Sequence, residues 1–349
     1  MTEAFAFYRF PHADHYTKLE GETQEFLSCA QLNGLSGFVV APFEVKTEQP
    51  IVVIRPDKLE TIALTADTIY NIKDEASASN QTTPTPDYAI DFANFHAQLQ
   101  QGVFRKIVLA RTVDEIMPMS AKPAELFHRA CHLYPRLFIA LVYTPQSGLW
   151  LTATPEILLE GRGGTWHTIA LAGTMKLEKD QLAGEGETAT WSTKNIEEQR
   201  IVATYVAECL EQFATDFHEE GPRTVRAANL VHLRSDFTFT LPDDLHIGDL
   251  LGRLHPTPAV CGLPKREAFQ FIISNEHTPR RYYSGFMGPL NVQQSTHLYV
   301  SLRCMSIDGG HYRLYAGGGL LKDSIEQQEW QETEAKLETM KRCIATNRT

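Results

Sequence analysis

The sequence predicts an α+β fold. Of its 349 residues, 43% are hydrophobic and 21% are charged, which is enough apolar material to bury a substantial core. Segments with helical periodicity alternate irregularly with probable β-hairpins, and no internal repeat is present. A parallel doubly wound sheet requires a regular alternation of strand and helix, so the irregular pattern favours α+β.

Several short segments have the composition of β-strands. The first 80 residues contain two such runs and lead into a linker-like segment at 76–88, the best candidate for a domain boundary. Residues 104–116 are rich in β-branched side chains. Residues 137–143 and 149–160 flank a short turn, so we expect them to pair as antiparallel neighbours. The expected strands are 35–40, 51–55, 104–116, 137–143, 149–160, 298–305 and 311–316.

Four segments have the spacing of amphipathic helices. Pro123 suits the first position of the second helix, and Glu198 extends the apolar stripe of the third. Ser324 is followed three residues later by Gln327, which predicts a capping box at the start of the C-terminal helix. The expected helices are 88–101, 123–134, 191–217 and the segment from Ser324 through residue 340.

Charge and composition exclude several classes of partner. A formal charge of −11 opposes the basic field that nucleic acid or an anionic membrane surface would require. The amino-terminal residues include early acidic side chains and no apolar run, so we expect no secretory signal and a cytoplasmic protein. No segment approaches the roughly 20 apolar residues that span a bilayer. The six cysteines form no CxxC pair, so we expect reduced thiols.

Two residues in apolar strand segments could carry acid–base chemistry. Lys106 lies in FRKIVLAR, where an inward-facing amine would be desolvated and usable as a base. Glu156 lies in ATPEILLE, where apolar neighbours could raise the pKa of the carboxyl group and make it a proton donor. Taken alone, each residue has a commoner interpretation: an exposed lysine, and a turn carboxylate at a sheet edge.

Acidic residues on two expected helices could bind a hard cation. Glu198 lies on an otherwise apolar stripe, and Glu329 and Glu332 lie one turn apart on the C-terminal helix. If these carboxylates converge, they would suit Mg²⁺, which prefers oxygen ligands. A solvated acidic helix surface explains them too and is commoner. Lys336 follows Glu332 by four residues, so an ordinary helical ion pair is an equal alternative.

Two further segments have more than one interpretation. YAGGGLL places three glycines directly after a strand, where backbone N–H groups could approach an anion, although a plain glycine turn is at least as common. His255 in LHPTPAVCGLPK could be a ligand, but we favour a structural hydrogen bond. No Rossmann, Walker, zinc-protease or α/β-hydrolase motif is present.

Ten segments, taken together and in order, resemble the chorismate-utilising enzymes. They are FRKIVLAR, TATPEILLE, ALAGT, KNIEEQRIV, NLVHLRSDF, LHPTPAVCGLPK, RRYYSGFMG, VSLRCM, YAGGGLLKDS and EWQETEAK. The resemblance covers residues 84–346, the motif-bearing core, and is loose over 1–83. It implies one large chorismate-binding unit over 1–349, in which layered, mainly antiparallel sheets are wrapped by helices. Residues 1–83 would be a divergent part of that unit.

The resemblance also implies a reaction. At variable positions the chain is similar to isochorismate synthases, which add water at C2 of chorismate as the C4 hydroxyl leaves. Lys106 would then be the base that activates water, and Glu156 the acid that protonates the leaving hydroxyl. Ala172 stands where lysine-nucleophile aminodeoxychorismate synthases carry lysine, and LHPTPAVCG differs from the corresponding salicylate synthase sequence.

Other functions stay open. A salicylate synthase, which continues by eliminating pyruvate, is the nearest alternative. A catalytically silent chorismate-binding subunit would need neither Lys106 nor Glu156. An anthranilate synthase is less expected, because no LLES-like feedback motif lies near the amino terminus. Menaquinone, siderophore and salicylate biosynthesis are all open as the destination of the product.

The resemblance implies ligand contacts as well. Glu198 and Glu332 would bind Mg²⁺, with Glu329 close by or acting through water, and the cation would neutralise the ring carboxylate. Gln199 and Asn195 depart from the family pattern near this metal site. We expect chorismate as the small-molecule partner and a monomeric chain. The expected substrate contacts are Ala172, Gly173, Thr174, His232, Arg303, Tyr315, Gly317, Gly318, Gly319 and Lys336.

Overall fold

The computed structural model describes residues 4–64, 83–116, 122–176, 190–227, 230–242 and 247–345. The candidate boundary at 76–88 lies mainly outside these ranges. The strands are β1 Ala4–Arg9, β2 His15–Phe26, β3 Gly37–Ala41, β4 Ile51–Ala63, β5 Lys106–Ile116, β6 Phe138–Thr144, β7 Gly148–Thr154, β8 Ile157–Arg162, β9 Thr165–Lys176, β10 Asp216–Ala227, β11 Leu230–Thr240, β12 Gly262–Leu263, β13 Phe286–Leu290, β14 Ser295–Val300, β15 Cys304–Asp308 and β16 His311–Leu320. The helices are α1 Pro86–Gln100, α2 Pro123–Leu133, α3 Thr193–Phe213, α4 Ile247–Leu254, α5 Lys265–Asn275 and α6 Glu326–Ile344, with a short 3-10 helix, η1, at Cys29–Leu32.

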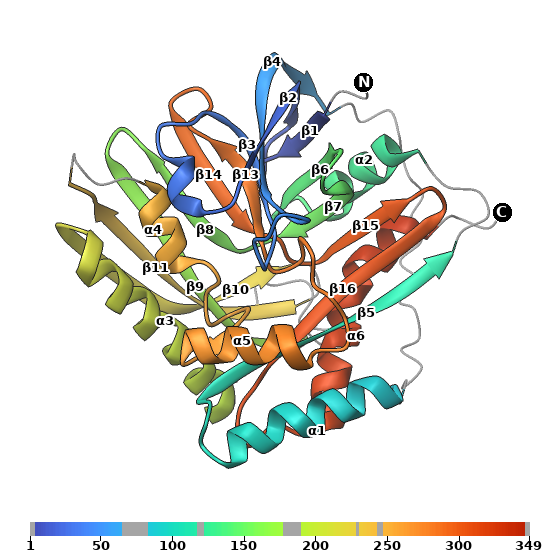
Figure 1. The fold of residues 1–349 in the computed structure, drawn as a ribbon, viewed down its shortest axis with the longest axis vertical. Helices are drawn as coiled ribbons and strands as arrows, with labels where there is room; N and C mark the ends of the chain where they lie inside the picture. The colour runs from blue at the N-terminus through green and yellow to red at the C-terminus, as the bar shows by residue number, and fades with distance from the viewer. Residues whose placement is uncertain are drawn as a thin grey trace.

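The described strands form one continuous sheet of sixteen strands, and neighbouring strands pair antiparallel. The order is β10-β11-β9-β8-β14-β13-β3-β4-β2-β1-β6-β7-β15-β16-β5-β12. Strands β1 to β4, from the first 63 residues, lie in the middle of this order. Helices cover the sheet from outside, with α3 along β9, α6 along β16 and α1 below β5 (Figure 1). The predicted α+β fold is confirmed.

The two ends of the strand order come together in space. Helix α6 contacts both β16 and β9, although these strands are far apart in the order. Arg303, just before β15, donates a hydrogen bond to His232 on β11 over 2.6 Å. Lys106 on β5 lies 2.9 Å from Glu198 on α3, which packs on β9. The space between the ends is therefore bounded by β5, β16 and α6 on one side and by β9, β11 and α3 on the other.

Apolar side chains bury both faces of much of the sheet. One core lies under α3 and α4, and a second lies under α2 and α6. A third is rich in aromatic rings, among them Phe138 and Tyr299, whose centroids are 4.1 Å apart. Strand β6 is buried along nearly its whole length, the pattern of a strand covered on both faces. The six cysteines are free thiols, as predicted.

The helix predictions are confirmed with changes at the ends. Helices α1 and α2 both begin with proline, whose missing N–H costs nothing at that position. Helix α3 is shorter than the expected 191–217, because the chain leaves the helix at Ala214 and turns into β10.

The predicted capping box at Ser324 is wrong. The N-cap of α6 is Ile325, and the Ser324 hydroxyl instead accepts a hydrogen bond from the backbone N–H of Leu321 over 3.0 Å. No helix in the described ranges is long and apolar enough to cross a membrane.

Two of the expected strands are broken beside the space between the sheet ends. The segment 149–160 divides into β7 and β8 at Pro155 and Glu156, because proline has no N–H to donate to a strand ladder. The segment 298–305 divides into β14 and β15 at a turn in which Arg303 has a φ of 46°. The prediction of continuous strands was therefore wrong at both places. Glu156 lies at the first break and Arg303 at the second, so neither side chain follows the inward–outward alternation of a strand.

Strand β9 contains a bulge at Gly173. His232 pairs with Thr174 and Leu233 pairs with Ala172, so Gly173 has no partner on β11. Its φ of 71° is a conformation that glycine adopts without steric cost. A Cβ at Gly173 would lie 3.1 Å from the carbonyl oxygen of Asn195. The bulge thus brings the main chain of β9 close to the first turn of α3.

The two edge strands differ in length. Strand β10 has twelve residues, with a register shift between Glu220 and Arg223 at the Gly221–Pro222 peptide. Strand β12 has two residues and pairs only with Lys106 and Ile107 of β5. One edge of β5 pairs with β16, and the other pairs with a strand only at Lys106 and Ile107. The backbone groups further along that second edge need hydrogen-bond partners other than a strand.

Candidate active site

A cavity of about 70 Å³ lies between the two ends of the sheet. Its walls come from both strand breaks, from β5, β9, β11 and β16, and from α3 and α6. Four predicted site residues, Lys106, Gly318, Glu329 and Glu332, are outside this lining. The predicted residues that line it are Glu156, Ala172, Gly173, Thr174, Glu198, His232, Arg303, Tyr315, Gly317, Gly319 and Lys336.

Lys106 is completely buried at the start of β5. Its side chain is 0% exposed, and Nζ lies 2.9 Å from Oε1 of Glu198. A Cβ at Gly319 would lie 2.8 Å from Cε of Lys106 and 2.1 Å from Oε1 of Glu198. Only glycine therefore leaves room for this ion pair beside the cavity. The alternative of an exposed lysine is wrong.

Glu156 is a buried carboxyl group on the cavity wall. The residue is 4% exposed, and burial raises its pKa to about 7, although Lys106, Lys336 and Arg303 act in the opposite direction. Its position is fixed through the main chain. The backbone N–H donates to the Thr154 hydroxyl over 3.2 Å, and the carbonyl oxygen accepts from the N–H of Val300 over 2.9 Å. A carboxyl group with this pKa can donate a proton near neutral pH.

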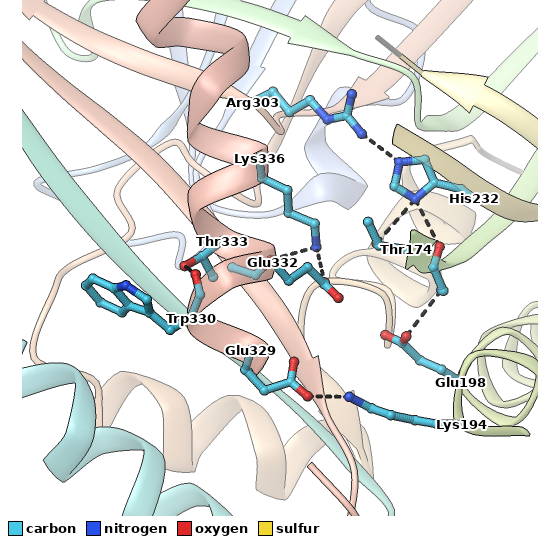
Figure 2. A network of polar contacts seen from close by, with 12 residues as sticks. Thr174, Lys194, Glu198, His232, Arg303, Glu329, Trp330, Glu332, Thr333 and Lys336 are labelled. Atoms are coloured by element: carbon cyan, nitrogen blue, oxygen red, sulfur yellow. Dashed lines mark hydrogen bonds and ion pairs between the residues drawn. The ribbon is translucent and has the colours of Figure 1, made fainter. Parts of the chain in front are cut away.

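The two carboxylates of α6 also pair with lysines (Figure 2). Glu329, which is 1% exposed, accepts a short hydrogen bond from Lys194 of α3. Glu332 accepts from Lys336, one turn further on, over 2.7 Å, so the ordinary helical ion pair is present. Both carboxylates lie beside Gly318: a Cβ there would be 3.3 Å from Oε2 of Glu329 and 3.7 Å from Oε1 of Glu332.

The carboxyl groups around the glycines differ in their pKa shifts. Burial raises the pKa of Glu329, and the neighbouring Glu332 carboxylate raises it further. Burial acts in the same direction on Glu198, but Lys106 outweighs it and holds the pKa of Glu198 below its ordinary value. In the described ranges, no three or more His, Cys, Asp or Glu side chains are grouped so that they could hold a metal ion. In this structure each of the three carboxylates is matched by a lysine.

Arg303 and His232 form a buried hydrogen-bonded pair. Arg303 donates from Nη2 to Nε2 of His232 over 2.6 Å, and from Nη1 to the carbonyl oxygen of Ala227 over 3.0 Å. Nδ1 of His232 lies 3.0 Å from the carbonyl oxygen of Gly173. Because arginine can only donate, Nε2 must accept, and the histidine proton is on Nδ1. The imidazole is neutral, since burial and the charge of Arg303 hold the pKa of His232 well below its ordinary value.

Arg303 is a buried cation that faces the cavity. Burial lowers the pKa of Arg303 to about 10, which leaves the guanidinium charged at neutral pH. None of its hydrogen-bond partners in the described part of the chain is a carboxylate. A charged guanidinium in this position is suited to bind an anionic group that enters the cavity.

Sequence reasoning missed Lys194 and Tyr283. Tyr283 lines the cavity and stacks on Tyr315 with ring centroids 5.5 Å apart. Lys194 lies in KNIEEQRIV and Tyr283 in RRYYSGFMG, two of the segments that resemble the family. Only their presence in these segments could have pointed to them, because no spacing pattern distinguishes either residue from its neighbours. His255 has the structural role that we favoured: its Nε2 lies 3.3 Å from the carbonyl oxygen of Pro42, and it does not line the cavity.

Comparisons with known proteins agree with these observations. The family model described as chorismate binding enzyme matches residues 40–345. Isochorismate synthase DhbC of Bacillus subtilis is 30% identical over 321 residues, which are 88% of this chain and 77% of the relative. Isochorismate synthase MenF of Escherichia coli is 32% identical over 242 residues, 68% of this chain and 55% of the relative. That sequence match therefore covers little more than half the length of MenF.

Solved structures show the same fold. DhbC from Bacillus anthracis superposes with a TM-score of 0.81 at 24% identity, covering 98% of this chain and 96% of that one. MenF from Escherichia coli gives a TM-score of 0.80 at 22% identity, covering 98% and 89%. The resemblance inferred from ten short segments is thus confirmed by the family match and by the fold. The protein belongs to the chorismate-binding enzymes.

Proposed function

We propose that the protein is a Mg²⁺-dependent isochorismate synthase, which converts chorismate to isochorismate. One observation carries the proposal: a buried acid and a buried candidate base lie near each other at the same cavity. Glu156 lines the cavity and has a pKa of about 7, and the nearby charge of Lys106 acts on that pKa. The names of the relatives that span most of this chain support it.

The cationic and amide groups of the cavity suit a dianionic substrate. Arg303 and Lys336 line the wall, and Gly317 and Gly319 bring the main chain to the surface of the cavity without side chains. We assign the two carboxylates of chorismate to these groups, because guanidinium, ammonium and oriented N–H groups bind carboxylates strongly when water is excluded. His232 would orient Arg303 through its acceptor nitrogen.

The reaction exchanges one water molecule for another. Lys106 acts as the free amine, so the ammonium proton of its ion pair with Glu198 must first leave to solvent. The amine then takes a proton from water while the water oxygen bonds to C2 of the ring. The ring double bonds shift, the bond from C4 to its hydroxyl breaks, and Glu156 gives its proton to the departing oxygen. The proton on Lys106 returns to Glu156 through solvent, which restores both groups. General acid and general base catalysis each contribute about 10²- to 10⁴-fold in rate.

The chain offers suitable oxygen donors for Mg²⁺. Glu198, Glu329 and Glu332 surround Gly318 and Gly319, where any Cβ would approach their carboxylate oxygens. We propose that Glu198 and Glu332 hold the cation and that Glu329 acts close by, because Mg²⁺ takes carboxylate oxygens as ligands. When bound, the cation would neutralise the ring carboxylate of the substrate. The lysines that now pair with these acids would have to release them.

Substrate binding requires the walls to separate. The cavity of about 70 Å³ is well below the roughly 300–1,000 Å³ that ligand pockets typically enclose. The pair of Glu332 with Lys336 lies next to Gly318, so releasing it would free Lys336 for a substrate carboxylate. The proposal therefore includes a more open state of the same site.

Product analysis tests the proposal against its nearest alternative. Ala259 and Val260 line the cavity and offer no side-chain hydroxyl, and we expect an isochorismate synthase and not a salicylate synthase. Purified protein with chorismate and Mg²⁺ at neutral pH should approach a mixture of chorismate and isochorismate, and isochorismate alone should return to the same mixture. Stoichiometric salicylate and pyruvate, measured by fluorescence and by a lactate dehydrogenase assay, would favour the alternative. Chorismate binding without turnover would instead indicate a silent binding subunit.

A further inference from the structure

A buried ion pair outside the cavity connects two segments of its wall. Glu276 follows α5, and Arg280 lies four residues later; their side chains are only 3% and 2% exposed. Arg280 donates from Nε to Oε2 of Glu276 and from Nη2 to Oε1, each over 2.7 Å. This geometry is bidentate and fixes the plane of the guanidinium. Neither residue takes part in the reaction proposed above.

The pair takes the place of a missing strand beside β5. Strand β12 pairs with only the first two residues of β5, so the next backbone groups on that edge need other partners. The N–H of Ala110 donates to Oε1 of Glu276 over 2.7 Å, and the carbonyl oxygen of Val108 accepts from Nη2 of Arg280 over 2.8 Å. A buried backbone group left unpaired would cost roughly 1–3 kcal/mol.

Arg280 also hydrogen-bonds to the cavity-wall segment at Val260, across from β5. Its Nη1 donates to the carbonyl oxygen of Val260 over 2.6 Å, and its guanidinium lies over the ring of Phe43, 4.4 Å from the centroid. Val108 and Val260 both line the cavity. One planar guanidinium is therefore hydrogen-bonded to two wall segments that lie far apart in the sequence.

We propose that Arg280 is a positioning residue for the reaction, which fixes the width of the cavity between Val108 and Val260 and the placement of Lys106 at its edge. Lys106 and Val108 are two residues apart on β5, so their side chains leave the same face of the strand and move together. The inference rests on the proposed function, because its consequence is a change in the placement of the base and of the substrate.

Arg280→Lys tests the proposal on the full chain. Lysine keeps the charge that Glu276 requires, but one ammonium group lacks the planar fork that reaches Val108 and Val260 together. We expect kcat/KM for chorismate to fall by about 10²-fold, with kcat per folded molecule reduced, because a shift of about 1 Å in a reacting group has this effect. Thermal stability should fall as well.

A matched control separates positioning from general stability. Arg9 is also buried and donates to the carbonyl oxygens of Pro135 over 2.6 Å and Tyr134 over 2.7 Å, but it does not line the cavity. Arg9→Lys should lower the melting temperature and leave kcat and KM of the folded protein unchanged. If Arg280→Lys behaves like this control, with a lower melting temperature and normal kinetic constants, the proposal is overturned.

A second variant and a binding measurement test the proposal even if Arg280→Lys does not fold. Should Arg280→Lys fail to fold, Glu276→Gln replaces it, since glutamine keeps an acceptor for Ala110 but loosens Arg280; the same kinetic change, smaller in size, is expected. Chorismate affinity, measured by equilibrium dialysis, should fall in either variant relative to the wild type. Wild-type protein that binds chorismate but makes no isochorismate would refute the proposed function alone, whereas unaltered affinity and turnover in the variants would refute only the role of Arg280.

Discussion

Glu156 and Glu160 lie four residues apart on one segment, yet their carboxyl groups have opposite pKa shifts. Glu156 precedes β8 and faces the cavity, and its pKa is raised to about 7. Glu160 lies within β8 on the other side of the break, and its pKa is lowered to about 2. Both are substantially buried, so burial alone cannot explain the difference.

The difference comes from hydrogen-bonded partners. Burial acts to raise the pKa of Glu160, but hydrogen bonds from Nδ1 of His167 over 2.8 Å and Nδ1 of His297 over 3.2 Å outweigh it. His167 also bonds Asp236 through Nε2 over 2.8 Å, and the pKa of Asp236 is likewise lowered to about 2. The cations near Glu156 act on its pKa only through longer-range charge effects. The hydrogen bonds of the outer network therefore stabilise charged carboxylates, while burial at the cavity raises the pKa of one carboxyl group to about 7.

Lys106→Ala should cause the largest change of all. The variant removes the proposed base and leaves Glu198 buried without its ion-pair partner. We expect isochorismate formation to fall by about 10²- to 10⁴-fold or more while the fold is kept. Steady-state assays with circular dichroism on the same sample measure both. Near-normal turnover by a folded variant would remove Lys106 from the mechanism.

Glu156→Gln and Glu160→Gln test directly whether the contrast between the two carboxyl groups matters for catalysis. The first should lower turnover by about 10²- to 10⁴-fold without loss of stability, because a neutral amide replaces a carboxyl group that is already costly to ionise. The second should keep turnover and lose stability, because His167 and His297 lose a charged acceptor. Equal effects of the two substitutions on turnover would show that the pKa contrast has no catalytic meaning.

The pH dependence of turnover follows from the same acid. Glu156 must be protonated to donate, so its raised pKa predicts that kcat of the wild type falls as pH rises through about 7. Rate measurements from pH 5 to 9 would locate this limb, and it should be missing from the residual activity of Glu156→Gln. A flat profile in the wild type would contradict the assignment of Glu156.

Glu198→Gln should have an intermediate effect, on metal affinity. A neutral amide is a poorer ligand for a hard dication than a carboxylate, so the Mg²⁺ concentration needed for half-maximal activity should rise by about tenfold or more. Calorimetric titration of Mg²⁺ gives a second readout that does not depend on turnover. EDTA-treated wild type with full activity and no added metal would refute the Mg²⁺ requirement.

His167→Gln should have the smallest effect, on stability alone. Two carboxylates raise the pKa of His167, although burial opposes them. The stabilisation is therefore complete below the unfolded-state pKa of about 6.5 and is lost as pH rises through the higher folded-state value. The variant should be less stable by about 1–3 kcal/mol at pH 5.5, with a smaller difference at pH 9. His218→Gln, at an exposed position on β10, is the control; a pH-independent difference would refute the charged network.

Local patterns predicted much of the fold and selected candidate residues for the site. Strand alternation and apolar flanks identified Lys106 and Glu156, and helical spacing placed Glu198, Glu329 and Glu332 on α3 and α6. Proline in TATPEILLE could have predicted the break between β7 and β8, since proline cannot continue a ladder. These features depend on neighbours within a few residues.

Long-range contacts could not be predicted in the same way. Lys194 meets Glu329 from a position 135 residues earlier, and Arg280 reaches the carbonyl oxygen of Val108 across 172 residues. The order of the sixteen strands, in which β5 lies beside β16 and β12, also depends on contacts that no short window contains. The family resemblance supplied candidate site residues that spacing alone left ambiguous.

The two edges of the sheet bear on how the protein behaves at high concentration. An exposed strand edge can pair with another chain and begin a β-type aggregate. The long edge strand β10 is interrupted by the Gly221–Pro222 bulge and carries Glu219, Glu220 and Arg223. At the other edge, β12 is only two residues long, and Glu276 and Arg280 already occupy backbone groups of β5 beyond it. The N–H of Ala110 and the carbonyl oxygen of Val108 are thus not free to pair with a strand of another chain.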